Sequence, residues 1–255
     1  MNAETYDKLK NIQDVYWWDV AKREIIIDVF KSYCFYIESS KILDVGCGMG
    51  LMLEKLSQYG EVYGMDFSPR AVEYCRETWD DMHIMHGALP DKVPFEKEYF
   101  NTIVVLDVIE HIDDDKESLN KLYSLLKEEG ALLITVPALK CLWSHNDVAV
   151  QHKRRYTKKT IEELCKSTGF QIKMCSYYNF WLCLPILVVR KIKNLLKMQK
   201  SDRPKEIRNA LINKLLYHIF SSERRRLVKG KSFPFGVSLI LVAQKPKLSS
   251  KEIVF

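Results

Sequence analysis

No two cysteines stand at Cys-x-x-Cys spacing, although the chain contains 7 cysteines in 255 residues. Structural zinc sites and disulfide frameworks use closely paired cysteines, so the scattered pattern argues against both and favours a reducing compartment. Long hydrophobic runs are also missing. The longest, FWLCLPILVV at residues 180–189, is about half of the ~20 residues that a membrane-spanning helix needs. The first residues, MNAETYDKLKNIQD, are polar and charged, which predicts no signal peptide. These absences predict a cytoplasmic protein without a transmembrane segment.

Charge is distributed unevenly along the chain. The net charge is +6, but residues 190–232 contain 14 Lys and Arg against 3 Asp and Glu, so the remainder is mildly acidic. Hydrophobic residues make up 47% of the chain, which is enough apolar material for a sizeable core. The length allows one full domain with an insertion, and the basic segment is the candidate for that insertion.

Short hydrophobic runs alternate with helical patterns through the middle of the chain. This alternation is typical of βαβ units and predicts an α/β fold with a Rossmann-like, doubly wound, mostly parallel sheet. Residues 4–36 have hydrophobic positions at helical spacing and are expected to be helical. A helix after the fourth strand is expected to end at Gly130, and Thr157 is expected to cap a later helix. The predicted divisions are an N-terminal helical cap at 1–38, the core at 39–179, a basic helical insertion at 180–232, a final core strand at 233–246 and a tail at 247–255.

A glycine-rich stretch, ILDVGCGMG at residues 42–50, follows the first predicted strand and opens a helix. Its glycines let the backbone turn tightly and approach a ligand, and the helix N-terminus presents free N–H groups. Asp66 ends the second predicted strand, where a carboxylate can accept hydrogen bonds from ribose hydroxyls. An empty turn is the alternative, and the acidic partner argues against it. The glycine spacing differs from the G-x-G-x-x-G of dinucleotide sites, which favours another nucleotide-containing ligand.

Four stretches together resemble the class I S-adenosylmethionine-dependent methyltransferases. They are ILDVGCGMG, GMDFSP at 64–69, PFEKEYFNTIVVLDVIEHIDD at 94–114 and GALLITVP at 130–137. The resemblance implies S-adenosylmethionine as cofactor and S-adenosylhomocysteine as product. It also implies that the glycines flank the methionine part, that Asp66 holds the ribose and that Asp107 lies near the sulfonium.

The same resemblance implies how adenine is held. Phe67 would lie against the ring. Many members have an aspartate after the third strand for the adenine amino group, whereas Ala88 stands about there in this chain, so backbone groups are expected to serve. The complete expected set of cofactor contacts is Asp44, Gly46, Cys47, Gly48, Gly50, Asp66, Phe67, Ala88, Leu89, Asp107, Val108, Trp18 and Arg23.

Three further stretches resemble a narrower subfamily of bacterial small-molecule methyltransferases. They are VYWWDVAKREIII at 15–27, LWSHNDVAVQHKRRYTKKTIEELCKSTGF at 142–170 and FPFGVSLILVAQKP at 233–246. The subfamily has a helical insertion before a final strand that pairs antiparallel. By this resemblance the tryptophans and Arg23 cover the cofactor pocket. Core packing is the other interpretation for Trp17 and Trp18.

Residues 145–156, HNDVAVQHKRRY, gather histidines, arginines, an aspartate and a tyrosine after the fifth strand. Loops at the carboxyl ends of parallel strands face the ligand crevice of such sheets. The segment could be a solvated loop, or its arginines could clamp a carboxylate or phosphate through their planar guanidinium groups. It could also contribute to a metal site or to a nucleic-acid contact.

The metal interpretation combines Asp107, Glu110 and His111 with His145 or His152. Small-RNA 3′-end methyltransferases have a similar Glu/His arrangement, but the first acid here is an aspartate. The EH pair is also common in related enzymes without a metal, so no metal is expected. The nucleic-acid interpretation would depend on the basic 190–232 segment. That segment has no recognisable RNA-binding motif, so nucleic acid is not the expected partner.

The chemistry of the acceptor decides which residues are needed. A carboxylate, with a pKa of about 4, is ionised at neutral pH, whereas a phenol of about 10 needs a base or a metal. We predict O-methylation of a small-molecule or peptide acceptor bearing a carboxylate, as in natural-product or ribosomal-peptide tailoring. The alternatives are metal-assisted methylation of a phenol, hydroxyl or RNA ribose, and cofactor binding without catalysis. The candidate catalytic residues are His145, Asp147, His152 and His111, with Asp147 orienting a histidine. The candidate substrate contacts are Arg154, Arg155, Tyr156, Trp143, Tyr177 and Asn179.

The basic insertion is expected to cover the pocket as a lid. It contains the amphipathic stretch LINKLLYHIF before an arginine triplet at 224–226. Such a helix can face a membrane surface, an acidic peptide or solvent, and the pattern does not choose among them.

Overall fold

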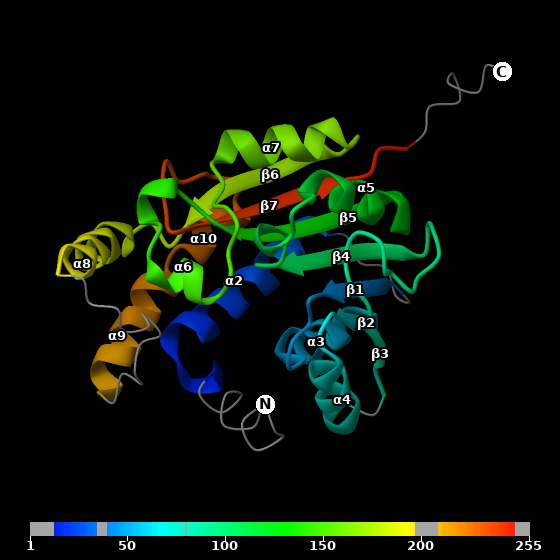
Figure 1. Cartoon of the computed structure of the whole chain (residues 1–255), viewed down its shortest axis with the longest axis horizontal. Coiled ribbons are helices and arrows are strands. Elements are labelled where there is room, and N and C mark those ends of the chain that lie inside the picture. Colours follow the sequence, from blue (N-terminus) through cyan, green and yellow to red (C-terminus); the bar gives the residue numbers. More distant parts are fainter. Residues whose placement is uncertain (1–12, 35–39, 80, 197–208, 248–255) are drawn as a thin grey trace.

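The computed structural model describes residues 13–34, 40–79, 81–196 and 209–247. One seven-stranded sheet in the order β3-β2-β1-β4-β5-β7-β6 forms its centre (Figure 1). All neighbouring strands pair in parallel except β7, which runs antiparallel to β5 and β6. The predicted doubly wound sheet with an antiparallel last strand is confirmed. The strands are β1 (Lys41–Val45), β2 (Glu61–Asp66), β3 (His83–His86), β4 (Phe100–Leu106), β5 (Leu126–Pro137), β6 (Gln171–Tyr178) and β7 (Ser238–Gln244).

Local signals set where several helices begin. The Oγ atom of Ser68 accepts a hydrogen bond from the Ala71 amide at 3.4 Å, and Pro69 is the first helical residue of α4. Thr157 and Thr160 form a reciprocal cap at the start of α7, which confirms the predicted cap. The helices are α2 (Trp17–Tyr33), α3 (Leu51–Leu56), α4 (Pro69–Thr78), α5 (Asp115–Leu125), α6 (His145–Ala149), α7 (Lys158–Ser167), α8 (Cys183–Leu195), α9 (Ala210–Ser221) and α10 (Arg224–Val228).

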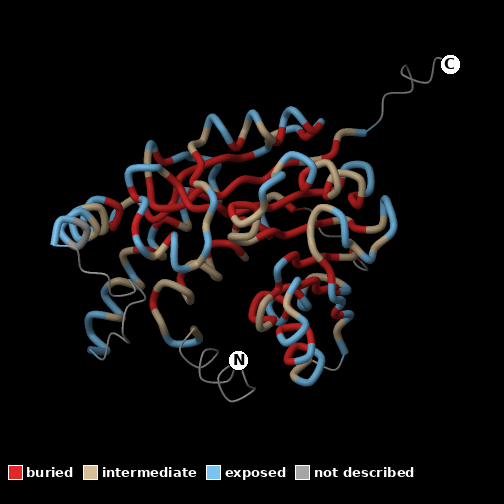
Figure 2. Tube along the Cα trace, in the orientation of Figure 1, coloured by how far each residue is buried: buried red, intermediate tan, exposed pale blue. Residues whose placement is uncertain are grey.

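The core lies in the middle of the sheet. Strands β4 and β7 are buried along nearly their whole length, and Figure 2 shows the buried residues gathered there. A strand covered on both faces has no reason to alternate apolar and polar side chains, because both sides of the pleat lie in the core. This explains why these strands appear in the sequence as continuous hydrophobic runs.

Helix α5 ends at Leu125 and not at Gly130, so the predicted length of this helix is wrong. The next residue, Leu126, pairs with Phe100 in the ladder between β4 and β5. The Tyr99 amide also donates to the Leu125 carbonyl at 2.9 Å. Leucines suit either a helix or a strand, and pairing across the sheet decides between them here.

The insertion packs against the N-terminal helix. Phe220 of α9 is fully buried, and its ring centroid lies 6.0 Å from that of Trp17 and 5.5 Å from that of Trp18. The helix predicted for residues 4–36 is represented by α2, while residues 4–12, 35 and 36 lie outside the described residues. Among the helices of the described ranges, none combines the length and the apolar character that crossing a membrane requires.

Candidate active site

The glycine-rich loop between β1 and α3 has three glycines at positive φ, two of which lie too close to other side chains to carry a Cβ atom. Gly46 has φ +74°, and a Cβ atom there would lie 2.4 Å from Cγ2 of Val108. Gly50 has φ +77°, and a Cβ atom there would lie 2.4 Å from Nε1 of Trp79. Gly48, with φ +53°, has open space where its Cβ would be. Positive φ and close contact both require glycine, and the open side at Gly48 leaves room for a ligand.

Asp66, at the end of β2, holds this loop in place. Its Oδ2 atom accepts a hydrogen bond from the Gly48 amide at 2.9 Å, and its Oδ1 atom accepts one from the Ser68 amide at 2.8 Å. The next residue, Phe67, is 75% exposed, as expected of a ring that lies against a ligand and not in the core. The nucleotide contacts predicted from the loop and from β2 are therefore brought together.

Other predicted cofactor residues surround the loop. Asp44 is buried, and burial, followed by the charge of Asp66, raises the pKa of its carboxyl to about 7. Cys47 is also buried. Ala88 uses both its backbone groups in a bridge with Lys92, so its own amide is engaged within the chain. Leu89 is half-buried directly after it.

At the end of β4, Asp107 forms an ion pair with Lys22 of α2. Its Oδ1 atom also accepts a hydrogen bond from Thr135 of β5 at 3.0 Å. Desolvation would raise the pKa of Asp107, but the Lys22 charge and these hydrogen bonds hold it below its usual value. Lys22 is not among the residues predicted from the sequence, although it stands four positions after Trp18 on the same helix face.

Arg23, expected at the cofactor, lies on another side of α2. Its Nη2 atom donates to the Gln13 carbonyl at 3.0 Å and lies 3.3 Å from the Asp14 carboxylate. Trp18 is half-buried against Phe220, so it takes part in packing. Within the part of the chain that the structure describes, neither side chain forms a hydrogen bond with the glycine-rich loop.

Asp147 and His152 form a hydrogen-bonded pair in the loop after β5. The distance between Oδ1 of Asp147 and Nδ1 of His152 is 2.9 Å. Asp147 is fully buried and also accepts from the Ser144 amide at 2.8 Å and from Nε of Arg155 at 2.7 Å. Burial would raise the pKa of Asp147, but the hydrogen bonds from His152 and Arg155 hold it far below its usual value. An ionised carboxylate only accepts hydrogen bonds, so Nδ1 of His152 carries a hydrogen, and in the neutral ring Nε2 is the proton acceptor.

Nε2 of His152 faces a second carboxyl group. It lies 3.8 Å from Oε1 of Glu110, whose side chain is fully buried and whose oxygens have no hydrogen-bond partner among the described residues. Burial, followed by the charge of Asp107, raises the pKa of Glu110 well above its usual value. The pKa values of the two carboxyl groups beside His152 are therefore shifted in opposite directions. The surroundings favour the ionised form of Asp147 and the protonated form of Glu110.

His111 completes this cluster. Its ring packs edge-on against the His152 ring with centroids 4.8 Å apart, and burial, followed by the His152 charge, lowers its pKa. One ligand atom each from Glu110, His111 and His152 lies within 4.8 Å of the others, so this trio could hold a divalent cation. The exposed His145 begins α6 and is not part of the cluster.

The arginines and the tyrosine of the predicted anion clamp bind the chain itself. Arg155 is 6% exposed, and its guanidinium bonds Asp147 and the Ala138 carbonyl, the latter at 2.8 Å. Arg154 pairs with Asp115 at 2.7 Å, and the Tyr156 hydroxyl donates to the same carboxylate at 2.8 Å. These contacts brace the loop and leave Arg155 and Tyr156 turned away from solvent.

The remaining predicted substrate contacts have different environments. Tyr177 is buried, and its hydroxyl accepts from the Lys158 amide at 3.0 Å. Asn179 is fully buried with φ +56° at the end of β6, and neither side-chain atom has a hydrogen-bond partner among the described residues. Trp143 is 37% exposed on the loop before α6. Asn179 therefore remains a candidate for binding a polar group.

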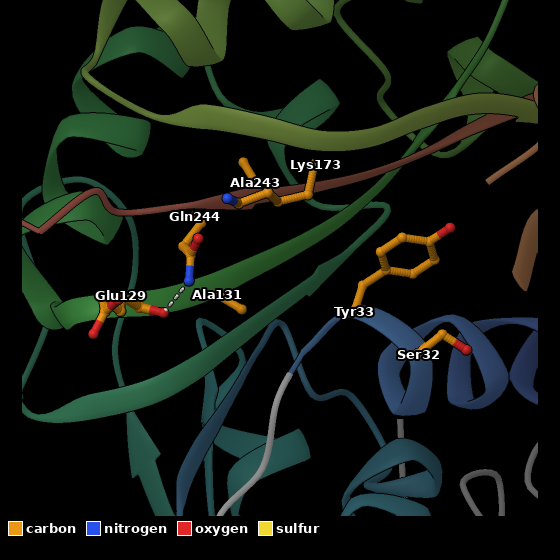
Figure 3. Close-up of a pocket in the computed structure, with 7 residues that line it drawn as sticks. All are labelled: Ser32, Tyr33, Glu129, Ala131, Lys173, Ala243 and Gln244. Atoms are coloured by element: carbon orange, nitrogen blue, oxygen red, sulfur yellow. Dashed lines mark hydrogen bonds between the residues drawn. The ribbon is translucent and has the colours of Figure 1, made fainter. Parts of the chain in front are cut away.

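A cavity of about 360 Å³ lies at the opposite end of the sheet (Figure 3). It is lined by Ser32 and Tyr33 from the end of α2 and by Ala131 from the first half of β5. The Gln244 amide closes one side by donating to the Glu129 carbonyl at 2.8 Å. The parallel strands begin here, whereas the polar cluster lies where they end, so this cavity is separate from the candidate active site.

Comparison with known sequences relates the chain to methyltransferases. Residues 23–173, more than half of the chain, match the sequence model of a family described as a methyltransferase domain. A Mycolicibacterium smegmatis protein that bears the name of an S-adenosylmethionine-dependent methyltransferase is 22% identical over 164 residues, which cover 63% of this chain and 62% of that protein. The human mitochondrial ubiquinone biosynthesis O-methyltransferase is 29% identical over 154 residues, covering 52% of this chain and 42% of that enzyme. The chain spans between 42% and 66% of the length of the curated relatives it matches.

Comparison with solved structures agrees on the fold. A methyltransferase in complex with the Haloferax volcanii Trm112 methyltransferase activator superposes with a TM-score of 0.62 and 18% identity. The match covers 96% of this chain and 96% of that one. At 18% identity, this similarity shows a shared fold.

Proposed function

The chain belongs to the methyltransferase domain family, whose cofactor is S-adenosylmethionine, and we propose that it transfers the cofactor's methyl group to a hydroxyl oxygen of a small-molecule acceptor. The observation that carries this proposal is the buried Asp147 carboxylate bound to Nδ1 of His152. A hydroxyl is a weak nucleophile until it loses its proton, and a histidine held in one tautomer is a suitable base.

The residues around the glycine-rich loop fit the cofactor. The open side of Gly48 would accommodate the methionine part, the Asp66 carboxylate would accept hydrogen bonds from the ribose, and the exposed Phe67 ring would cover adenine. When bound, the cofactor supplies an electrophilic methyl group on a positively charged sulfur. The Asp107 carboxylate, fixed by Lys22 and Thr135, places negative charge at the end of β4 beside this site.

Proton transfer is assigned to the loop after β5. Nε2 of His152 would accept the proton of the acceptor hydroxyl, which makes the hydroxyl oxygen a stronger nucleophile. Asp147 stabilises the imidazolium that forms and holds the ring in position, as the acid partner of a histidine base does in general. Burial raises the pKa of Glu110 and so favours its uncharged form, which would leave His152 neutral before reaction.

The carboxylate acceptor expected from the sequence is less well supported. Its recognition depended on Arg154 and Arg155, and both guanidinium groups are bound to carboxylates of this chain. A carboxylate acceptor would also have no use for the Asp147–His152 pair, because it is already ionised at neutral pH. The relatives that carry the name ubiquinone biosynthesis O-methyltransferase agree with an oxygen acceptor.

A metal-assisted reaction is the second candidate, and the trio Glu110, His111 and His152 favours it. A divalent cation there would lower the pKa of an acceptor hydroxyl directly, with His152 as a ligand in place of a base. The hydrogen bond that Nδ1 of His152 donates to Asp147 would then orient the ligand nitrogen. The neutral His152 ring has one free nitrogen, so the two roles exclude each other.

The test is transfer of labelled methyl from S-adenosylmethionine to host-cell small-molecule, peptide and RNA fractions, with and without EDTA. An alkali-stable product in the small-molecule fraction, unaffected by EDTA, is expected. Label released by mild alkali as methanol would instead mean a carboxyl ester and would contradict the proposal. Loss of activity in EDTA would assign His152 to a metal. Cofactor binding without labelled product in any fraction would support a non-catalytic role.

A further inference from the structure

Two helices of the insertion expose large hydrophobic side chains. On α8 the exposed residues Leu184, Val188, Ile192 and Leu195 follow helical spacing, and Leu195 is 83% exposed. On α9 the exposed residues are Leu211, Ile212 and Leu215. We call these seven residues the insertion face. Monomeric proteins rarely leave such sets of apolar side chains in water, so the insertion face is expected to be covered by a partner.

The two helices extend from the same end of the molecule, away from α3 and α4 (Figure 1). Many residues of both helices are coloured as exposed in Figure 2. On its inner side α8 packs through Cys183, Ile186 and Leu187 on Leu142 and Val237. The helix is thus docked by one apolar side while a second apolar side faces outward.

The charge of these helices identifies the kind of partner. The sequences of α8 and α9, CLPILVVRKIKNL and ALINKLLYHIFS, contain no Asp or Glu. Lys191 on α8 and Lys214 on α9 are exposed beside the apolar residues. Apolar side chains flanked only by positive charge are typical of helices that lie in the interface of an anionic membrane. A second copy of the chain docked through the same face would bring these lysines against each other, which disfavours it.

We propose that the insertion face binds the surface of an anionic lipid bilayer, with α8 and α9 lying in the interface. At 13 residues, α8 is too short to span the bilayer but long enough to lie along it. Leucine, valine and isoleucine side chains enter the acyl boundary, and the lysines remain at the level of the phosphate groups.

This contact would place the active site close to the membrane. Nη1 of Arg190 on α8 donates to the Leu142 carbonyl at 2.6 Å. Leu142 immediately precedes the segment of Trp143 and Ser144 that leads to Asp147, and Ser144 is bonded to that carboxylate. The helix that meets the lipid is therefore attached directly to the loop that carries the proposed base.

Vesicle flotation with the full-length protein tests the proposal. We compare vesicles of phosphatidylcholine alone with vesicles that contain about one-third phosphatidylglycerol. Binding to the anionic vesicles is expected, and raising the salt from about 0.05 M to about 0.5 M should weaken it because screening shortens the reach of the charges. The assay contains no cofactor or acceptor, so its failure would leave the proposed methyl transfer untouched.

Paired variants separate the apolar and the electrostatic contributions. Val188→Asp combined with Ile192→Asp should weaken binding about tenfold or more, whereas Met85→Asp on β3 should not. Lys191→Glu combined with Lys214→Glu should lower the affinity for anionic vesicles by about fivefold or more for each lysine. Its control, Lys116→Glu combined with Lys166→Glu, changes net charge equally on the exposed surface of α5 and α7.

Circular dichroism checks that every variant remains folded. The proposal would be overturned if the protein bound neither kind of vesicle. It would also be overturned if the protein bound both kinds equally and the lysine substitutions left that binding unchanged. Sedimentation of a dimer that Val188→Asp with Ile192→Asp converts to a monomer would show that a second copy covers the insertion face, and would also overturn it.

Discussion

One oxygen of Asp147 lies 2.9 Å from Nδ1 of His152 and 2.7 Å from Nε of Arg155. A single buried carboxylate therefore orients the proposed base and neutralises a buried guanidinium. The catalytic role of this loop depends on the same ion pair that holds its shape. Substitutions at His152 and at Asp147 should therefore distinguish the catalytic contribution of this loop from its contribution to stability.

Replacement of His152 tests the base. His152→Gln should lower the rate of methyl transfer by about 10²–10⁴-fold, because the hydroxyl would lose its proton without assistance. Affinity for S-adenosylmethionine, measured by calorimetry, should remain. His145→Gln is the matched control on exposed α6. A larger loss in His145→Gln than in His152→Gln would transfer the role of base to His145.

Replacement of Asp147 tests the ion pair. Asp147→Ala leaves the charge of Arg155 buried without a partner, which should lower the free energy of unfolding by about 3–5 kcal/mol. Arg154→Ala breaks a more exposed pair with Asp115 and should cost about 1 kcal/mol or less. Urea denaturation of the three proteins measures both values. Similar small losses in the two variants would show that the Asp147–Arg155 pair contributes little.

Alanine substitutions in the glycine-rich loop should have different effects. Gly46→Ala introduces a Cβ atom 2.4 Å from the Val108 side chain at positive φ, so both stability and cofactor affinity should fall. Gly48→Ala meets no protein atom within 4 Å, so it should destabilise less, by about 1 kcal/mol from positive φ alone. Its methyl group points into the proposed cofactor site and should reduce cofactor affinity at least as strongly. Unchanged affinity in Gly48→Ala would place the cofactor elsewhere.

The raised pKa of Asp44 predicts a pH-dependent stability. Its carboxyl has a pKa of about 7 in the folded protein against about 4 when unfolded, so the folded state binds the proton more tightly. Its contribution is complete below about pH 4 and is lost as pH rises to about 7. Asp44→Asn should remove this slope and raise the free energy of unfolding at pH 8 by a few kcal/mol. Identical pH dependence in the two proteins would show that Asp44 is ionised without penalty.

Glu110 distinguishes the two ways of activating the acceptor. If Glu110 is a neutral buried acid, Glu110→Gln replaces it with a group of the same shape and should preserve most activity. If Glu110 is a metal ligand, the amide is a poor substitute and activity should fall with metal content. Methyl-transfer rates together with metal analysis of both proteins decide the matter. His111→Gln provides the second ligand variant for comparison.

Much of the fold follows from local pattern. The alternation of apolar runs with helical periods predicts the doubly wound sheet. The start of α7 is also predictable, because the Thr157 side chain caps the helix. Gly46, Gly50 and Asp66 are identifiable because the turn and the strand end that need them are set by nearby residues. The end of α5 was misjudged because Leu125 and Leu126 suit both a helix and a strand.

The roles of the polar residues were decided by tertiary structure. Residues 145–156 are recognisable as a cluster, but only the folded chain shows that Arg155 binds Asp147 while Nε2 of His152 faces Glu110. Lys22 meets Asp107 across 85 residues, and Glu110 faces His152 from another loop. Periodicity and turn chemistry act between near neighbours, so the sheet and the glycine-rich loop can be predicted from local pattern. Pairing between distant charges depends on which strand ends the sheet order brings together, so it follows from the folded arrangement and not from local pattern.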